Sequence, residues 1–235
     1  MVSRVSRRHM LSAGLGAGAL LALPDVLRAE TAGQLAFAPT KEDRIVFEIL
    51  RNGGKIGEHA VTFTPGDADA LRVTTDIAIS VSVLGITAYR YEQAVEEVWR
   101  DDRLMSLSSR TNDDGTRKTV EGARNGAAFE VVDKDGESRS LSGPVLTTSL
   151  WHRRTPYVSK LVGIEDGGIR KVTSESLGRE TLRMGGGSLD TEHYRLTGDF
   201  TRDLWYDSRD RLVQAGFNTK RDGSRIELQA VDLTG

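Results

Sequence analysis

The clearest pattern in the chain is a strict alternation of apolar and polar residues over residues 71–83. The apolar positions are Leu71, Val73, Ile77, Ile79, Val81 and Val83, with Thr75 in phase with them. Alternation of period two places these side chains on one face of a β-strand, whereas a helix cannot collect them on one side. Gly85 permits a turn, and residues 86–100 predict a second long strand. Its shared face carries Tyr89, Tyr91, Val95 and Trp99, interrupted by Gln93 and Glu97.

Shorter runs of the same kind fill most of the chain after residue 43. Two of them, residues 45–49 and 56–63, flank Asn52-Gly53-Gly54, which predicts a hairpin. Closely spaced Asn/Asp-Gly turns between later runs favour an antiparallel meander. Residues 142–163 are the exception, and any helix is expected there. We therefore predict an all-β fold: a single strongly curved antiparallel sheet, a barrel or half-barrel, with little helix.

Two turn regions share one form. Residues 99–105 and 204–213 both contain Trp, a short polar turn and Asp-Arg-Leu. Asp stabilises such turns by bonding backbone N–H groups, and Leu restarts the strand. The similarity is compatible with a weak internal repeat and equally with two similar hairpins.

The N-terminus has the features of an export signal. Residues 1–29 combine a basic start with an uncharged run that is too short for a typical membrane-spanning helix. Arg7 and Arg8, followed by Met10 and Leu11, resemble the twin-arginine motif, and an ordinary secretory signal is the alternative. We expect cleavage after Ala29, with a site after Ala32 as the alternative, a flexible leader over residues 30–43, and one antiparallel β domain over residues 44–235. The expected location is the periplasm.

Composition excludes several classes of protein. The 235 residues contain 32 Lys and Arg, 34 Asp and Glu, and no Cys. The balanced charge gives no basic face for nucleic acid, and no nucleic-acid partner is expected. The absence of Cys excludes disulfides, thiolate metal sites and cysteine nucleophiles. No segment beyond the signal approaches the length of a membrane span, so we expect no stable span after signal cleavage.

Several segments together suggest a family. They are residues 44–63, Tyr89-Arg90-Tyr91-Glu92, Trp99-Arg100-Asp101, residues 110–115, residues 194–199 and Leu204-Trp205-Tyr206-Asp207. This set resembles an exported family of unknown function found mainly in proteobacteria. The architecture is also similar to that of periplasmic lipoprotein carriers, which implies a curved sheet around an apolar concavity. No binding residue is carried over from those carriers.

The histidines of the mature chain give little support for catalysis. His59, His152 and His193 are not paired at metal-ligand spacing, and no metal site or cofactor is predicted. Ser188, Asp190 and His193 crowd into one turn and strand without a nucleophile elbow. No catalytic residue is assigned. An enzyme remains the alternative, and it would require His59, Arg90, Glu92 and His193 to face one pocket.

Two sets of residues suggest a ligand site. His152-Arg153-Arg154 is compatible with a clamp for an anionic head group and with an exposed basic loop. Aromatic residues on several strands would line either a filled core or a cavity for an apolar ligand. The candidate ligand-binding residues are Tyr89, Tyr91, Trp99, Trp151, Arg153, Arg154 and Trp205.

These patterns predict a non-enzymatic periplasmic protein that binds or carries a hydrophobic ligand of the lipid or isoprenoid class. An acyl-like chain would lie against Ile77, Ile79, Val81 and the aromatic residues, and residues 142–163 would open for release. Two alternatives remain. One is a hydrolase or isomerase of the cell envelope that uses residues such as His193, and the other is an assembly factor that pairs through a sheet edge. No protein partner is identified.

Overall fold

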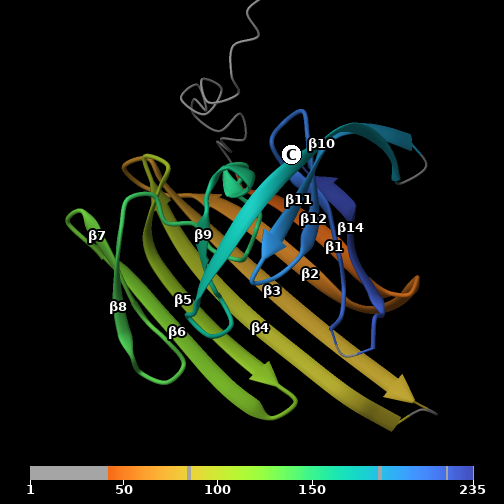
Figure 1. The fold of residues 1–235 in the computed structure, drawn as a ribbon, viewed down its shortest axis with the longest axis horizontal. Coiled ribbons are helices and arrows are strands. Elements are labelled where there is room, and N and C mark those ends of the chain that lie inside the picture. Colours follow the sequence, from red (N-terminus) through yellow and green to blue (C-terminus); the bar gives the residue numbers. More distant parts are fainter. Residues whose placement is uncertain (1–41, 84–85, 185–186, 221, 235) are drawn as a thin grey trace, which may run out of the picture. The chain divides into compact units, whose positions relative to one another are not determined.

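One antiparallel sheet of 14 strands contains most of the described chain (Figure 1). The computed structural model describes residues 42–83, 86–184, 187–220 and 222–234. The expected signal peptide of residues 1–29 lies outside the described residues, as does the expected leader apart from its last two positions. The sheet confirms the predicted all-β class. The described ranges contain no helix with the length and apolar character needed to cross a bilayer.

The first meander runs through eight strands in chain order. They are β1 (Asp43–Arg51), β2 (Gly54–Pro65), β3 (Ala70–Val83), β4 (Ile86–Arg100), β5 (Arg103–Asp113), β6 (Thr116–Asn125), β7 (Ala128–Val132) and β8 (Ser138–Ser142). The predicted strand over residues 86–100 matches β4, and the strand predicted over residues 71–83 begins one residue earlier as β3. Alternation of apolar and polar residues therefore predicted the two longest strands of this meander.

The second meander follows a short 3-10 helix, η2 (Thr155–Tyr157). Its strands are β9 (Lys160–Val162), β10 (Ile169–Met184), β11 (Gly187–Gly198), β12 (Arg202–Asp207), β13 (Leu212–Asn218) and β14 (Arg225–Thr234). The first and last strands, β1 and β14, pair with each other and join the two meanders into one sheet. The edge strands are β8 and β9, which form no ladder with each other in the described chain.

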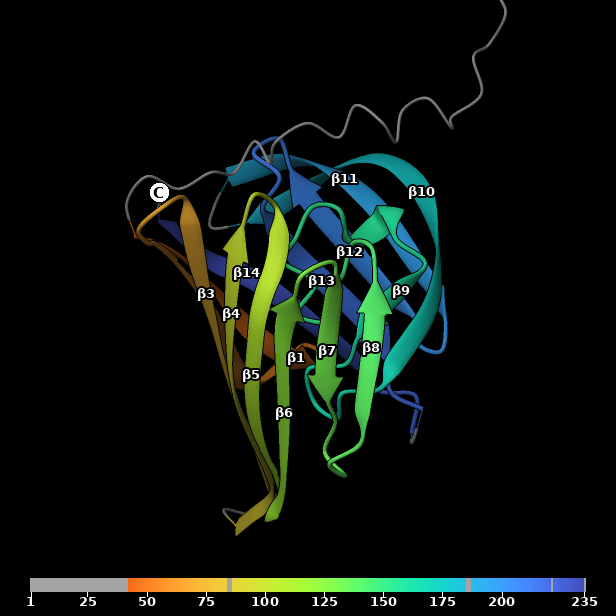
Figure 2. The same ribbon diagram turned by 90° about the vertical axis from the view of Figure 1, so that its left-hand side faces the viewer.

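The sheet curves so that β3–β8 and β10–β12 form facing walls (Figure 2). Residues 143–168, which we term the inner segment, pack against the inner faces of both walls. Trp151 contacts Phe63 and Trp99 with ring centroids 5.3 and 5.4 Å apart. From the other wall, the hydroxyl of Tyr206 donates to the carbonyl of Leu150 at 2.7 Å. The inner segment thus fills much of the concavity with a packed core.

A buried carboxylate anchors the inner segment to β4. Glu97 is only 1% exposed and accepts hydrogen bonds from the indole nitrogens of Trp99 and Trp151, at 3.2 and 2.7 Å. The hydroxyls of Thr147 and Ser149 donate to its other oxygen at 2.5 and 3.1 Å. Buried polar groups are costly unless they are bonded, and four donors satisfy this one.

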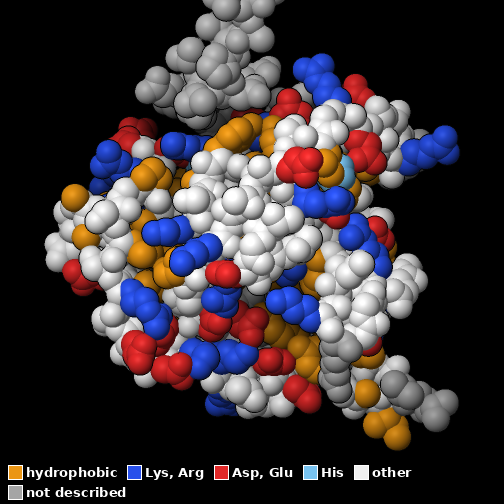
Figure 3. Space-filling view, viewed as in Figure 1, with side chains coloured by type: hydrophobic (Ala, Val, Ile, Leu, Met, Phe, Trp, Pro, Cys, Tyr) orange, Lys and Arg blue, Asp and Glu red, His pale blue; other side chains and the backbone are white. Residues whose placement is uncertain are grey.

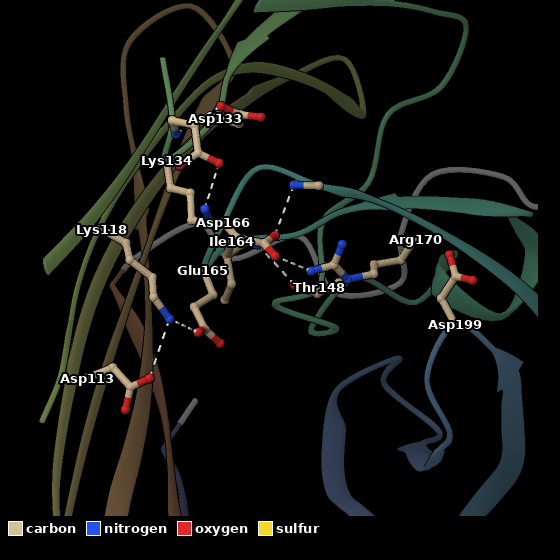
Figure 4. A network of polar contacts seen from close by, with 12 residues as sticks. Asp113, Lys118, Asp133, Lys134, Thr148, Ile164, Glu165, Asp166, Arg170 and Asp199 are labelled. Atoms are coloured by element: carbon tan, nitrogen blue, oxygen red, sulfur yellow. Dashed lines mark hydrogen bonds and ion pairs between the residues drawn. The ribbon is translucent and has the colours of Figure 1, made fainter. Parts of the chain in front are cut away.

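The loop at the end of the inner segment bridges the gap between the two edge strands. The backbone nitrogen of Lys134, in the β7–β8 turn, donates to the carbonyl of Asp166 at 3.2 Å (Figure 4). Arg170 on β10 bonds the carboxylate of Asp166 at 2.5 Å. Gly167 has φ 75°, and a Cβ there would lie 2.6 Å from the Cα of Asp133. The loop can therefore pass this close only with glycine at that position.

Candidate functional site

A row of inner-face residues marks where the filled core ends. Cross-strand pairing places these side chains side by side, from β1 to β6: Phe47, His59, Ile77, Gln93, Thr111 and Lys118. The side-chain amide of Gln93 donates to the Thr111 hydroxyl at 2.9 Å and to the carbonyl of Ile164 at 3.2 Å. The tip of the inner segment therefore rests on this row.

From Ile77 of this row outward, the inner face of the β3–β4 hairpin carries a strip of apolar and aromatic residues. We call it the β3–β4 strip; its members are Ile77, Ile79, Val81, Tyr89 and Tyr91. Each is only partly buried, and none belongs to the main core cluster or to the residues packed against it. Figure 3 shows hydrophobic side chains at the lower right of the molecule, where these two strands extend. The strip is thus an apolar surface that the fold leaves partly open.

A charged cluster lies beside the strip, on β5, β6 and the tip of the inner segment. The ammonium group of Lys118 lies 2.5 Å from an oxygen of Glu165 and 3.4 Å from one of Asp113 (Figure 4). The hydroxyl of Tyr89 donates to the other oxygen of Asp113 at 2.9 Å. Hydrogen bonding to Glu165 raises the pKa of Lys118, and this effect exceeds the opposing effect of burial. Two carboxylates against one ammonium give this cluster a formal charge of −1.

His59 is a buried polar group beside the strip. Its ring lies 5.3 Å from the ring of Phe47, its cross-strand partner on β1. The residue is 6% exposed, and its Nε2 has no hydrogen-bond partner among the described residues. Burial lowers the pKa of His59 from its ordinary value to about 4. The imidazole is therefore neutral at physiological pH.

The structure divides the aromatic candidates between two environments. Tyr89 and Tyr91 lie in the β3–β4 strip. Trp99 and Trp151 are buried in the core and bond Glu97, so they face no open surface.

Trp205 lies on the opposite face of β12 from the inward-facing Tyr206. It stacks on His193 with ring centroids 4.1 Å apart, and its indole nitrogen donates to Glu180 at 2.7 Å. Trp205 is therefore separate from the strip.

The two arginines of the predicted clamp diverge. Arg153 bonds Asp210 at 3.1 Å and Tyr194 at 2.9 Å, and it also pairs with Glu192. Its charge is thus compensated within the protein, beside a cavity of about 520 Å³.

Arg154 instead donates to the carboxylate of Asp102 at 2.5 Å. The ring of His152 lies 2.7 Å from the other oxygen of that carboxylate. Burial raises the pKa of Asp102, whereas the hydrogen bonds with His152 and Arg154 lower it. The lowering effect is the larger in total, so the net shift of the pKa is downward.

The constellation that the enzyme alternative requires is not assembled. His59 faces inward, whereas Arg90 and Glu92 form an ion pair of 2.5 Å on the outer face of β4. His193 lies on β11 against Trp205, with Glu180 3.2 Å and Asp203 3.5 Å from its ring nitrogens. The described residues also hold no group of three or more His, Cys, Asp or Glu arranged to bind a metal ion.

Three residues that position the site were not identified as such from the sequence. Gln93 and Glu97 interrupt the apolar face of β4, and both are buried on that face. They alternate in phase with Tyr91 and Trp99, and this pattern could have identified them, because a polar residue on a buried face needs a specific hydrogen-bond partner. Lys118 carries no comparable signal, since its partner Glu165 is distant in sequence.

Comparison with known proteins identifies the fold and the family. No curated protein matches the sequence. Among solved structures, the chain is similar to the "Beta-barrel-like Protein of Domain of Unknown Function DUF1849" from Brucella abortus, with a TM-score of 0.59 and 9% sequence identity. The match covers 83% of this chain and 98% of that one, and at this identity it establishes the fold alone. A family profile matches residues 47–231, and the chain therefore belongs to the family described as a domain of unknown function, DUF6134.

Proposed function

We propose that this protein is a non-enzymatic periplasmic binding protein that holds a hydrophobic ligand, of the lipid or isoprenoid class, against the β3–β4 strip. One observation carries the proposal. Five apolar or aromatic side chains on the inner face of a curved sheet remain partly exposed beyond the end of the packed core. Concave apolar surfaces of this kind are the usual place for hydrophobic ligands.

The strip can hold an extended chain without charged contacts. Burial contributes about 0.8 kcal/mol per methylene, so a chain of about ten methylenes that is half covered gains roughly 4 kcal/mol. Tyr89 and Tyr91 add flat aromatic surface to the aliphatic side chains of Ile77, Ile79 and Val81. Because the strip is open along one side, a ligand can enter and leave without unfolding the core.

The charged cluster beside the strip favours a ligand without an anionic group there. Asp113 and Glu165 outnumber Lys118, which already pairs with both. A carboxylate or phosphate beside this cluster would be repelled and would find the ammonium of Lys118 already paired. A neutral hydroxylated end can exchange hydrogen bonds with these groups. We therefore place lipids and isoprenoids with neutral ends before free fatty acids.

The first experiment is native mass spectrometry of the mature protein, purified gently from periplasm, followed by organic extraction. We expect a stoichiometric hydrophobic molecule with a neutral end. A clean mass in such preparations, together with failure to bind the neutral fluorophore N-phenyl-1-naphthylamine, would overturn the proposal. Stable copurification with a protein instead would favour an assembly factor that uses the edge of β8.

A pair of variants tests the location of the site. Ile79→Glu places a carboxylate in the strip, and we expect at least a tenfold loss of fluorophore affinity. Ala78→Glu is the matched control, because Ala78 is exposed on the outer face of the same strand. Equal affinities for the two variants would exclude the strip as the site. Thermal unfolding of both variants shows whether either effect arises from lost stability.

A further inference from the structure

A second cavity lies at the opposite end of β4 from the open end of the strip. Its volume is about 400 Å³, and it lies between the β4–β5 turn, the β6–β7 turn and the beginning of the inner segment. Asp101 in the β4–β5 turn is 12 residues from Tyr89, or roughly 40 Å at the rise of a β-strand. A ligand in this cavity is therefore distinct from a ligand on the strip.

Three guanidinium groups come together at this cavity from separate parts of the chain. Arg103 begins β5, Arg124 is near the end of β6, and Arg154 precedes η2. The carboxylates that line the cavity are those of Asp101 and Asp102. Three cations and two anions give the lining a formal charge of +1.

Arg124 is held in place without neutralisation of its charge. Its Nε donates to the carbonyl of Leu104 at 2.8 Å, and its Nη1 donates to the carbonyl of Ala127 at 3.3 Å. Both acceptors are neutral, and no ion pair to Arg124 or Arg103 occurs in the part of the chain that the structure describes. A partly buried guanidinium fixed by carbonyl groups is oriented for an external oxyanion.

Arg154 adds a second oriented donor. Its Nη1 donates a hydrogen bond to Asp102, and the Nε2 of His152 lies within hydrogen-bond distance of the other oxygen of that carboxylate. Among the described residues, the Arg154 side chain donates a hydrogen bond from Nη1 alone, which leaves its other N–H groups for a ligand. The remaining wall of the cavity is apolar, formed by Ala127, Pro144 and Val145.

We infer that this cavity binds a small organic oxyanion: a carboxylate or phosphate group with a short apolar body. The oxyanion would accept hydrogen bonds from Arg124 and Arg154, and Arg103 would add charge at the rim. The apolar body would lie against Pro144 and Val145. Because these two residues begin the inner segment, the ligand would contact both the sheet and the segment that fills it.

Isothermal titration of the mature protein with acetate, butyrate, inorganic phosphate and the neutral analogue butyramide tests this inference. We expect saturable binding of butyrate, weaker binding of acetate, and no detectable binding of butyramide. Binding of phosphate but not of butyrate would support the role of the arginines and contradict the proposed role of the apolar wall. The inference is overturned if none of the anions binds, or if butyramide binds as tightly as butyrate.

Variants separate this site from the strip. Arg124→Met and Arg103→Met should each weaken butyrate binding at least fivefold, and Arg103 is exposed, so its loss does not threaten the fold. Arg100→Met is the matched control, since Arg100 is an exposed arginine of the same hairpin outside the cavity lining. Ile79→Glu should leave butyrate binding unchanged even where it abolishes fluorophore binding. Unchanged affinity in both Arg103→Met and Arg124→Met would contradict the site.

Discussion

The indole nitrogen of Trp151 lies 2.7 Å from a carboxylate oxygen of Glu97, and this bond ties the inner segment to the middle of the sheet. The two residues are 54 positions apart in the sequence. Among the described residues, the side-chain partners of Glu97 are the neutral donors Trp99, Thr147, Ser149 and Trp151. The stability of the filled half of the concavity therefore depends on one buried acidic side chain.

Replacement of Glu97 by leucine should lower the free energy of unfolding by at least about 3 kcal/mol, because several buried donors lose their acceptor at a cost of about 1–3 kcal/mol each. Urea denaturation provides the measurement. Glu96→Leu is the control: Glu96 is on the outer face and forms an exposed ion pair with Arg72, and its loss should cost less than about 1 kcal/mol. Similar losses for the two variants would show that Glu97 does not anchor the inner segment.

His59 should make stability sensitive to mild acid. Its pKa is about 4 in the folded protein and about 6.5 when unfolded, so the unfolded chain binds the proton more readily. The resulting loss of stability begins as the pH falls below about 6.5 and is complete near pH 4. Between pH 7 and pH 4.5 it amounts to about 2 kcal/mol.

The measurement is urea denaturation at the two pH values for the wild type and His59→Leu. The difference between the two proteins isolates this histidine from the carboxylates, which titrate in both. Parallel pH dependence in the two proteins would mean that His59 is not buried as a neutral ring.

Arg153 should contribute to stability rather than to ligand binding. It joins η2 to β11 through Tyr157, Tyr194 and Glu192, and its side chain is 14% exposed. Arg153→Met should reduce the free energy of unfolding by roughly 1–2 kcal/mol, because Arg153 is largely buried but its carboxylate partners Glu192 and Asp210 are 45% and 27% exposed. Arg179 lines the same cavity but is exposed, so Arg179→Met serves as the control. A loss of ligand affinity at unchanged stability would instead support the hypothesis that Arg153 binds an anionic head group.

The expected export route is tested by the arginine pair itself. Arg7→Lys/Arg8→Lys should retain the precursor in the cytoplasm, whereas Arg4→Lys should be exported normally. Cell fractionation and immunoblotting distinguish precursor from mature protein by size. Normal export of the double variant would favour an ordinary secretory signal.

The long strands could be predicted from the sequence because alternation is a local property of consecutive residues. The strand over residues 86–100 and its inward-facing Tyr89, Tyr91 and Trp99 are found where the pattern places them. The outward direction of Arg90 and Glu92 follows from the same periodicity.

The parts of the site that depend on distant contacts could not be predicted in this way. Arg153 and Arg154 are adjacent in sequence, yet each bonds a carboxylate on a different part of the sheet. The path of the inner segment depends on Glu97, and the oxyanion cavity joins Arg103, Arg124 and Arg154. Sequence spacing carries no information on such contacts, because each depends on how the sheet curves.

The pairing of β1 with β14 has a consequence for biosynthesis. The first strand finds one of its two neighbours only when residues 225–234 have been made. During translation, β1 therefore presents an unpaired edge for as long as the rest of the chain is being synthesised. The sheet can be completed only after residues 225–234 have left the ribosome, so a chain that lacks them keeps an unpaired strand edge at β1.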